Sequence, residues 1–398
     1  MKKTCPGQER RIYLDHNATT PVDKRVLEAM EPYFCGIYGN PSSIHLAGEK
    51  ARKVVEESRQ TVMNFINADL PGEIVFTSCG TESDNFAIKG TAFANREKGN
   101  HIITSKIEHH AVLESCEYLA KYFGFDVTYL DVDKNGLINP EDVEKAITGK
   151  TVLVSIMYAN NETGVIQPVD EIAKIVKKHN IAFHTDAVQS AGKTPIDVKK
   201  LGVDLLSVSG HKMYAPKGCG FIYIKKGTKL HSILHGGKHE NGRRAGTENV
   251  PYIAGLAKAC EIAGENMPNE TVRLLKLRDK LENGIFNGLE HTYLNGHPAK
   301  RLANTSNISF KYIEGEGLIL LLNKEGIEVS TGSACTSGTS APSHVLSAMG
   351  IDPITAQGSV RFSLGHQNTG KDIDRVLSVL PVIVAKLRSM SPLWAKRQ

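Results

Sequence analysis

Polar side chains follow several apolar segments of this chain, at the points where strands would end. The segment FTSCGTESDN (76–85) carries Gly80 and Thr81, which would offer backbone N–H groups and a hydroxyl at the start of a helix. A helix N-terminus of this kind is a natural phosphate site. An ordinary N-cap has the same composition, so this segment alone leaves both interpretations equally open.

The segment FHTDAVQS (183–190) places Asp186 and Gln189 at the end of an apolar run. A buried carboxylate there needs a cationic partner or several hydrogen-bond donors. One functional use of such a carboxylate is to keep a proton on a heterocyclic nitrogen. The alternative, a capping Asp for the next turn, is the better interpretation of this segment taken alone.

The segment SVSGHKMYAPKGCG (207–220) is more informative, because Lys212 follows an apolar run and precedes a loop rich in Pro and Gly. A lysine partly withdrawn from water has a lowered pKa and can act as an amine nucleophile. Ser209 and His211 beside it can donate to an anion. The alternative is a solvated surface lysine, which is the commoner fate of this residue type.

The three segments together indicate one cofactor, pyridoxal phosphate. This cofactor needs a lysine for its covalent attachment, a carboxylate at its pyridinium nitrogen and donors around its phosphate. The segment IEHHAV (107–112) adds an imidazole, His109 or His110, that could stack on the pyridine ring and move protons. The joint pattern is much more specific than any of its parts.

The segment TGSACTSGTS (331–340) surrounds Cys335 with small, conformationally loose residues, whereas a cysteine kept for packing should have large apolar neighbours. The chain has seven cysteines and no C-x-x-C pair, so neither a zinc ribbon nor a thioredoxin motif is expected. The other six are interpreted as buried or incidental thiols. Reduced thiols and the absence of a signal peptide predict a cytoplasmic protein.

The elements that must position these residues alternate between β-rich runs and amphipathic segments. This alternation predicts an α/β fold with a mainly parallel seven-stranded sheet covered by helices, and ligands at the carboxyl ends of its strands. The predicted strands are 73–78, 101–105, 126–132, 151–159, 181–187, 205–210 and 220–226. The predicted helices include 82–98, 109–123, 140–148 and 169–179.

The pattern changes after residue 262, where long helical segments and two further strands indicate a smaller α+β domain. We therefore expect a large cofactor-binding domain over 21–262 and a small domain made of 1–20 and 263–398, which carries Cys335. The predicted elements of the small domain are helices 270–289, 314–326 and 371–389, and strands 307–313 and 359–365.

The formal net charge is only +5 and the basic residues are spread out, which argues against a nucleic-acid partner. No apolar run reaches the length needed to cross a membrane. The segment 131–142 copies part of a calcium-binding loop, but Asp142 stands where a bidentate Glu is usual. We interpret it as a tight turn that leads into a helix, and we predict no resident metal site.

Many motifs give the chain a resemblance to cysteine desulfurases, which are class V, fold-type I pyridoxal-phosphate enzymes, and most of all to their nitrogen-fixation (NifS) type. The resemblance runs from residue 13 almost to the C-terminus. Its motifs are YLDHNATTPVD (13–23), GNPSSIH (39–45), FTSCGTESDN, EHHAV, NNETG (160–164), FHTDAVQS, SGHKMYAPKG, GRRAGTEN (242–249), GSACTSG and RFSLG.

The resemblance implies a role for each matching residue. Lys212 would form the covalent link to the cofactor, Asp186 would pair with the pyridinium nitrogen and Gln189 would donate to the phenolate oxygen. His109, the first of the two histidines, would stack on the ring and act in catalysis. The phosphate would be held by Gly80, Thr81, Ser209, Gly210 and His211, and by Thr247 from the second subunit of a homodimer.

The resemblance also implies the reaction. Asn161, counted with both cofactor and substrate, and Arg361 would bind L-cysteine, with Arg361 on its α-carboxylate. Cys335 would accept the sulfur as a persulfide, and L-alanine would leave. The persulfide would pass to a scaffold protein that builds iron–sulfur clusters, where it would contact a nascent cluster, and nitrogenase is the expected destination.

Other functions fit parts of the same pattern. A selenocysteine lyase, a housekeeping cysteine desulfurase and a class V aminotransferase are the rival enzymes, although an aminotransferase has no need of Cys335. A binding or scaffold protein without a cofactor is the rival outside enzymes. The presence of Lys212 and Asp186 argues against this last alternative.

Overall fold

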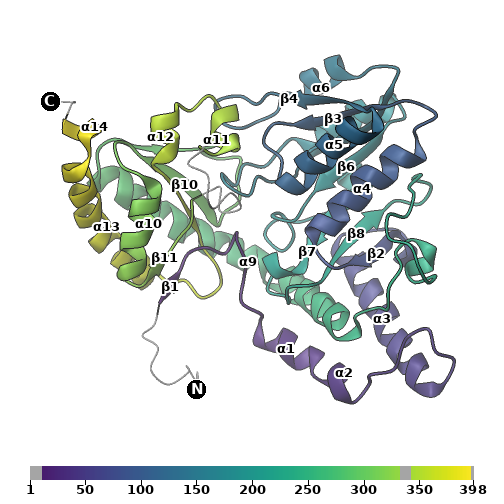
Figure 1. Ribbon diagram of the computed structural model, residues 1–398. Coiled ribbons are helices and arrows are strands. Elements are labelled where there is room, and N and C mark those ends of the chain that lie inside the picture. The colour runs from purple at the N-terminus through teal and green to yellow at the C-terminus, as the bar shows by residue number, and fades with distance from the viewer. Residues whose placement is uncertain (1–10, 332–341, 396–398) are drawn as a thin grey trace.

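The computed structural model describes residues 11–331 and 342–395 of the 398-residue chain. A large sheet with its helices forms one half of the molecule, and a smaller sheet with α10 (Gly315–Lys324) and α13 (Gly370–Met390) forms the other. Helix α9 (Val250–Gly288) runs from one half into the other (Figure 1). This arrangement is the predicted α/β fold with an added α+β part.

The large sheet has seven strands, in the order β2-β8-β7-β6-β5-β3-β4. Only β8 runs antiparallel to its neighbours, so the sheet is mainly parallel, as predicted. The strands are β2 (Ile74–Thr77), β3 (His101–Ser105), β4 (Asp126–Leu130), β5 (Thr151–Ser155), β6 (Ala182–Asp186), β7 (Leu205–Ser209) and β8 (Gly220–Ile224). Five of the seven strands are buried at every residue, which explains their nearly continuous apolar sequences.

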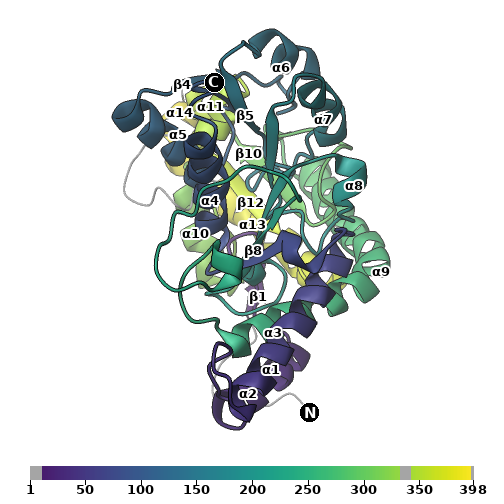
Figure 2. The same cartoon turned by 90° about the vertical axis from the view of Figure 1, so that its right-hand side faces the viewer.

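Helices cover both faces of this sheet, because successive strand side chains point to opposite sides. Figure 2 shows α4 (Gly80–Ala94) and α5 (His110–Phe123) on one side, and α7 (Val169–Lys178) on the other. Helix α4 begins two residues earlier than predicted and ends four residues earlier, where Asn95 leaves the helical conformation. Helix α3 (Leu46–Phe65), which packs on α9, is not among the helices predicted above.

The segment 131–142, which copies part of a calcium-binding loop, forms a tight turn. The Asp133 carboxylate accepts from the backbone N–H groups of Asn135 and Leu137, and α6 (Pro140–Ala146) follows with Asn139 as its N-cap. A strand precedes the turn, as expected. Because the Asp133 carboxylate accepts from backbone amides, the predicted turn leading into a helix is confirmed.

The smaller sheet joins β9 (Thr292–Leu294), β10 (Thr305–Phe310) and β12 (Ser359–Ser363) in antiparallel pairs. The N-terminal β1 (Ile12–Tyr13) pairs in parallel with β11 (Ile327–Glu328). The second hydrophobic core is built from Leu14 together with residues between Leu274 and Val384. The described residues before Asp23, 11–22, therefore lie against both halves of the chain.

Helix α9 crosses the position at which the sequence predicts the domain boundary. The helix was predicted to begin at 270, whereas it begins at Val250 and continues through Pro268 to Gly288. Its first part, up to Ile262, belongs to the core beneath the large sheet, and Leu274, Leu281 and Ile285 belong to the second core. The division into 21–262 and 263–398 remains an expectation.

Candidate active site

The predicted phosphate and ring-binding segments meet at the carboxyl edge of the large sheet. Asp186 is the last residue of β6 and Ser209 the last of β7, and Gly80 opens α4 directly after β2. A Cβ atom on Gly80 would lie 2.7 Å from Val188 Cγ2 and 3.4 Å from Ser209 Cβ. The close approach of these three loops therefore requires a glycine at position 80.

This edge offers a set of donors that fits a phosphate. The 15-residue helix α4 presents its unpaired N–H groups from Gly80 onward. The Ser209 hydroxyl is buried without a hydrogen-bond partner among the described residues. Thr81 is exposed and lines the same open cavity as His109. An orphaned hydroxyl beside a helix N-terminus is the arrangement expected of an anion site.

Asp186 is suited to a protonated ring nitrogen. Its carboxyl is buried, and this burial raises its pKa to about 6, against the lowering effects of the Val188 N–H and the Lys212 charge. Its Oδ1 accepts from the Val188 N–H at 2.8 Å. A buried carboxylate of this kind gains a strong partner when a cation is brought to it.

Lys212 ends the short turn Gly210–Lys212 and reaches back to the N-terminal segment. Its Nζ donates to the backbone carbonyls of Asn17 at 2.6 Å and Ala18 at 2.8 Å. The neighbouring His211 contacts the Thr19 hydroxyl at 3.1 Å. Burial, with the Lys212 charge second, lowers the pKa of His211 to about 4, so this imidazole is neutral near pH 7.

The structure distinguishes the two histidines of EHHAV. His109 is the N-cap of α5, where its Nδ1 accepts from the Ala111 N–H at 3.1 Å. Burial and then the Lys212 charge lower its pKa to about 4. The side chain of His110 is 38% exposed and lies 4.0 Å from Glu114. His109 is therefore the imidazole that faces Lys212.

The predicted substrate residues Asn161 and Arg361 lie in contact. Arg361 donates from Nη1 to the Asn161 carbonyl at 2.9 Å and from Nη2 to Asp15 at 2.7 Å. Its side chain is 3% exposed, and its Nε has no partner among the described residues. A guanidinium with an orphaned donor is suited to a carboxylate ligand.

Asn17 and Lys193 are functional candidates that the sequence analysis does not single out. Gln189 donates from Nε2 to the Asn17 carbonyl at 2.9 Å and accepts from Lys193 Nζ at 2.8 Å. Asn17 lies inside one of the motifs that carry the resemblance, which is the only signal in the sequence. Nothing in the sequence around Lys193 distinguishes it from a surface lysine.

Of the other predicted residues, Thr247 lies apart from this cluster and Cys335 lies outside the described residues. Thr247 is exposed on the segment before α9, near Arg244, which pairs with Glu82 at 2.7 Å. Cys335 falls between Thr331 and Pro342, outside the described residues. The described cysteines form no disulfide. Within 11–331 and 342–395, no group of three or more His, Cys, Asp or Glu could hold a metal ion.

Comparison with known proteins assigns the family. The model of the aminotransferase class-V family matches residues 12–376, which is most of the chain. The chain belongs to the class-V aminotransferase family. Pyridoxal phosphate is the cofactor of this family, and the donors, the buried Asp186 and Lys212 described above fit it. The predicted fold, cofactor and enzyme class are confirmed.

Two curated relatives of this class-V enzyme are named cysteine desulfurase IscS. The protein of Methanosarcina thermophila is 55% identical over 98% of both chains, and that of Dictyoglomus turgidum is 52% identical over 96% of this chain and 97% of its own. These names do not confirm the predicted nitrogen-fixation type. They agree with the broader prediction of a desulfurase-like protein.

Solved structures give the same result. A NifS-like protein matches with a TM-score of 0.89 and 43% identity, over 95% of this chain and all of that chain. SspA in complex with cysteine matches with a TM-score of 0.79 and 38% identity, over 89% of this chain and 98% of that chain. Among the described helices of the class-V enzyme, none is long and apolar enough to cross a membrane.

Proposed function

We propose that this class-V enzyme is a cysteine desulfurase. In the overall reaction the Cys335 thiol and L-cysteine give a Cys335 persulfide and L-alanine. One S–S bond and one C–H bond of the alanine methyl group form, while the C–S bond of the substrate and one thiol S–H bond break. The names of the relatives support this reaction, and so does the neighbourhood of Arg361.

The proposal rests mainly on the contacts of the described residues that flank the segment containing Cys335. Ser330 and Arg361 exchange two backbone hydrogen bonds, of 3.3 and 2.7 Å. At the other end, Ser343 donates to Glu162, the neighbour of Asn161, at 2.5 Å. Cys335 follows Ser330 by five residues, so it can lie at most about 18 Å from it. Both ends of the segment thus lie beside the two residues proposed to bind substrate.

Each residue of the cluster has a defined task in this reaction. When bound, pyridoxal phosphate supplies an electron sink for bonds at the substrate Cα. Arg361 holds the α-carboxylate and so orients the Cα–H bond. Lys212, whose amine is partly buried, takes the α-proton, and His109 shields the site from water. Asp186 keeps its negative charge beside the ring nitrogen.

The partners are also part of the proposal. We infer a homodimer in which Thr247 of one subunit completes the phosphate site of the other, since this threonine is exposed in the single chain. Exposed apolar side chains support an interface over residues 34–46, where they include Phe34, Tyr38, Ile44 and Leu46. The proposed sulfur acceptor is an iron–sulfur scaffold. The IscS names favour a housekeeping role over supply of nitrogenase.

The test measures alanine and sulfide released from L-cysteine, with a reductant present, by wild type and Cys335→Ser. Cys5→Ser, at a cysteine that precedes the first of the motifs above, is the matched control. We expect Cys335→Ser to lose sulfide release by a factor of at least about 100. The control should remain active.

Sulfide release that survives in Cys335→Ser contradicts the persulfide step. Selenocysteine is assayed in parallel, because a selenocysteine lyase would release selenium from this variant at the wild-type rate. Transfer of the amino group of L-cysteine to an added 2-oxo acid, without release of sulfide, would indicate an aminotransferase instead.

A further inference from the structure

A second lysine, Lys193, is partly buried and lies beside Gln189. Its amine donates to Gln189 Oε1 at 2.8 Å and to Asn17 Oδ1 at 3.2 Å. Burial, with the Lys212 and Arg361 charges as lesser causes, lowers its pKa far below the usual range. No described carboxylate forms an ion pair with it. A partly buried lysine whose described partners are amide oxygens rather than carboxylates needs an explanation.

The contact with Lys193 fixes the orientation of the Gln189 amide. A side-chain amide has an oxygen that accepts and a nitrogen that donates two hydrogens, and its two ends have nearly the same shape. The Lys193 amine contacts two side-chain oxygens, Gln189 Oε1 and Asn17 Oδ1, so it is the donor in both hydrogen bonds. Lys193 therefore holds the oxygen on its own side and leaves both N–H groups of Gln189 pointing away from it.

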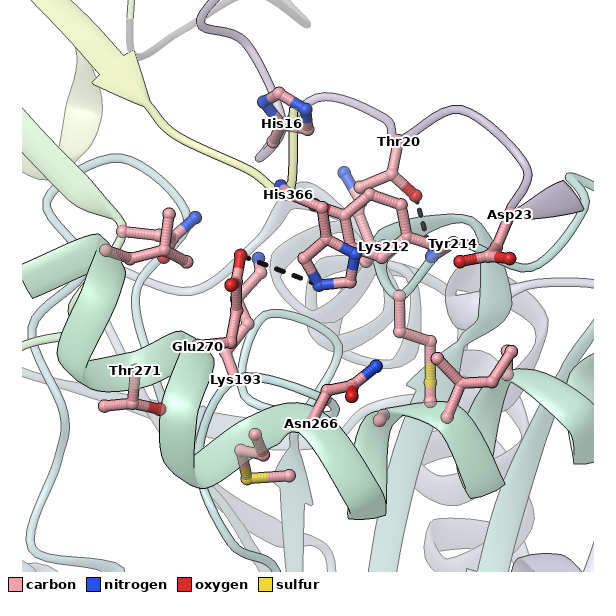
Figure 3. Close-up of a pocket in the computed structure, with 18 of the residues that line it drawn as sticks. His16, Thr20, Asp23, Lys193, Lys212, Tyr214, Asn266, Glu270, Thr271 and His366 are labelled. Atoms are coloured by element: carbon pink, nitrogen blue, oxygen red, sulfur yellow. Dashed lines mark hydrogen bonds and ion pairs between the residues drawn. The ribbon is translucent and has the colours of Figure 1, made fainter. Parts of the chain in front are cut away.

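Asn17 extends this arrangement to Lys212. Its backbone carbonyl accepts both from Gln189 Nε2 at 2.9 Å and from Lys212 Nζ at 2.6 Å. Its side-chain oxygen accepts from Lys193 and from Asn304 Nδ2 at 3.1 Å. Figure 3 shows Lys193 and Lys212 lining one cavity beside α9. Both amines donate to Asn17, Lys212 to its backbone carbonyl and Lys193 to its side-chain oxygen.

We propose that Lys193 is a positioning residue for the cofactor, which acts by orienting the Gln189 amide. One N–H of Gln189 is used by the Asn17 carbonyl, and the other would be left for the phenolate oxygen of bound pyridoxal phosphate. Without Lys193 only the Asn17 carbonyl holds the amide, and Gln189 Oε1 loses its donor, so the amide is less firmly oriented. This inference rests on the proposed role of Gln189.

The experiment is a double-mutant cycle on cofactor binding. Cofactor-free wild type, Lys193→Met, Gln189→Ala and the double variant are titrated with pyridoxal phosphate, and the dissociation constant is read from the absorbance of the bound cofactor. Methionine keeps the length of the side chain and removes the amine, so the fold should be retained. Lys193→Gln is a second variant, and Lys200→Met, at an exposed position, is the matched control.

We expect each single substitution to weaken cofactor binding about tenfold, as for one lost hydrogen bond to a charged group. The double variant should bind like Gln189→Ala, because an amide that is absent cannot be oriented. Lys200→Met should bind the cofactor like wild type. Combined with Gln189→Ala, it should weaken binding no more than Gln189→Ala does alone. A purely structural role of Lys193 would lower the thermal midpoint of the cofactor-free protein without this coupling.

Three results overturn the inference. Wild-type binding by Lys193→Met, or a double variant weakened about a hundredfold, removes the positioning role while the role of Gln189 stands. Wild-type binding by Gln189→Ala removes the role of Gln189 as well, and the inference falls with it.

Discussion

At the scale of single residues, burial sets the protonation states of the active site more than pairing does. Burial is the largest cause of the shifts at Asp186, His109 and His211, and charged partners come second or later. Near pH 7 the site therefore holds neutral imidazoles around the Lys212 amine. Neutral imidazoles do not repel a cationic ring, which suits them to stack on one.

His184 shows the same effect below the site and can be tested directly. Burial lowers its pKa to about 3, and its two ring nitrogens contact the hydroxyls of Ser155 at 2.8 Å and Ser207 at 2.9 Å. Below pH 6.5 the unfolded chain binds a proton at this residue and the native chain does not. The stability that His184 confers is thus present near pH 7.5 and is lost as the pH falls.

We expect the cost of His184→Gln, measured as free energy of unfolding in urea, to be smaller at pH 4.5 than at pH 7.5. The difference between the costs at the two pH values should approach about 2.7 kcal/mol, which is the effect of one proton bound by the unfolded chain over two pH units. The cofactor-free protein is used at both pH values. His235→Gln, at an exposed position, should cost the same at both. An equal cost of His184→Gln at the two pH values contradicts the prediction.

The sequence predicts the residues of the site that follow strands, and it misses those that act through distant contacts. Asp186, Ser209 and Lys212 stand next to apolar runs, so the strand pattern alone brings them to one edge. Asn17 and Lys193 are 176 residues apart and meet only in the folded chain. No local pattern encodes such a contact.

At the scale of elements, α9 is the helix on which both cores depend. Its glycines differ in their surroundings. A Cβ on Gly284 would lie 2.4 Å from Leu377 Cδ1, where α9 packs on α13. A Cβ on Gly264 would meet nothing within 4 Å. The two positions therefore separate helix propensity from packing.

We expect Gly264→Ala to raise the free energy of unfolding by about 0.5–1 kcal/mol, because alanine favours the helix. Gly284→Ala should lower it by about 1–3 kcal/mol, because the added methyl displaces Leu377. Chemical denaturation of both variants checks the pair. If Gly284→Ala instead raises the free energy of unfolding, α9 and α13 are packed loosely at this position.

Element types were easier to predict than element ends. The sequence predicts all seven strands of the large sheet, and the pattern is strongest for the five that are buried at every residue. The start of α9 was missed by twenty residues, because its first part is buried on several sides and shows little amphipathic periodicity. Helix α3 was missed although Val55 and Val62 are buried on one face.

At the scale of the whole molecule, the proposed dimer predicts that two defective chains can complement each other. Lys212→Ala removes the amine in its own site, whereas Thr247→Asp would place a carboxylate against the phosphate of the partner's site. In a mixed dimer of this kind, both defects fall in one site and the other site is intact.

We expect each variant alone to be inactive, and a refolded equal mixture to recover about a quarter of wild-type sulfide release, as random pairing of a two-fold dimer predicts. A mixture of Lys212→Ala and Asp186→Ala chains is the control. Both residues act in the site of their own subunit, so each site of a mixed dimer carries one defect and neither site is intact. An inactive Lys212→Ala and Thr247→Asp mixture, despite dimers on gel filtration, contradicts the shared site.

The pairing of β1 with β11 has a consequence for biosynthesis. Asp15 leaves the ribosome 346 residues before Arg361, its partner in the ion pair, and β1 has no strand to join until Ile327 has been made. The large sheet can form on the growing chain, but the Asn17 segment is seated on both sides only near the end of translation. Cofactor binding is then a late event. In a chain that stops before Ile327 the Asn17 segment is not held in place, so the carbonyls that accept from Lys212 are not in position and its amine is exposed to solvent.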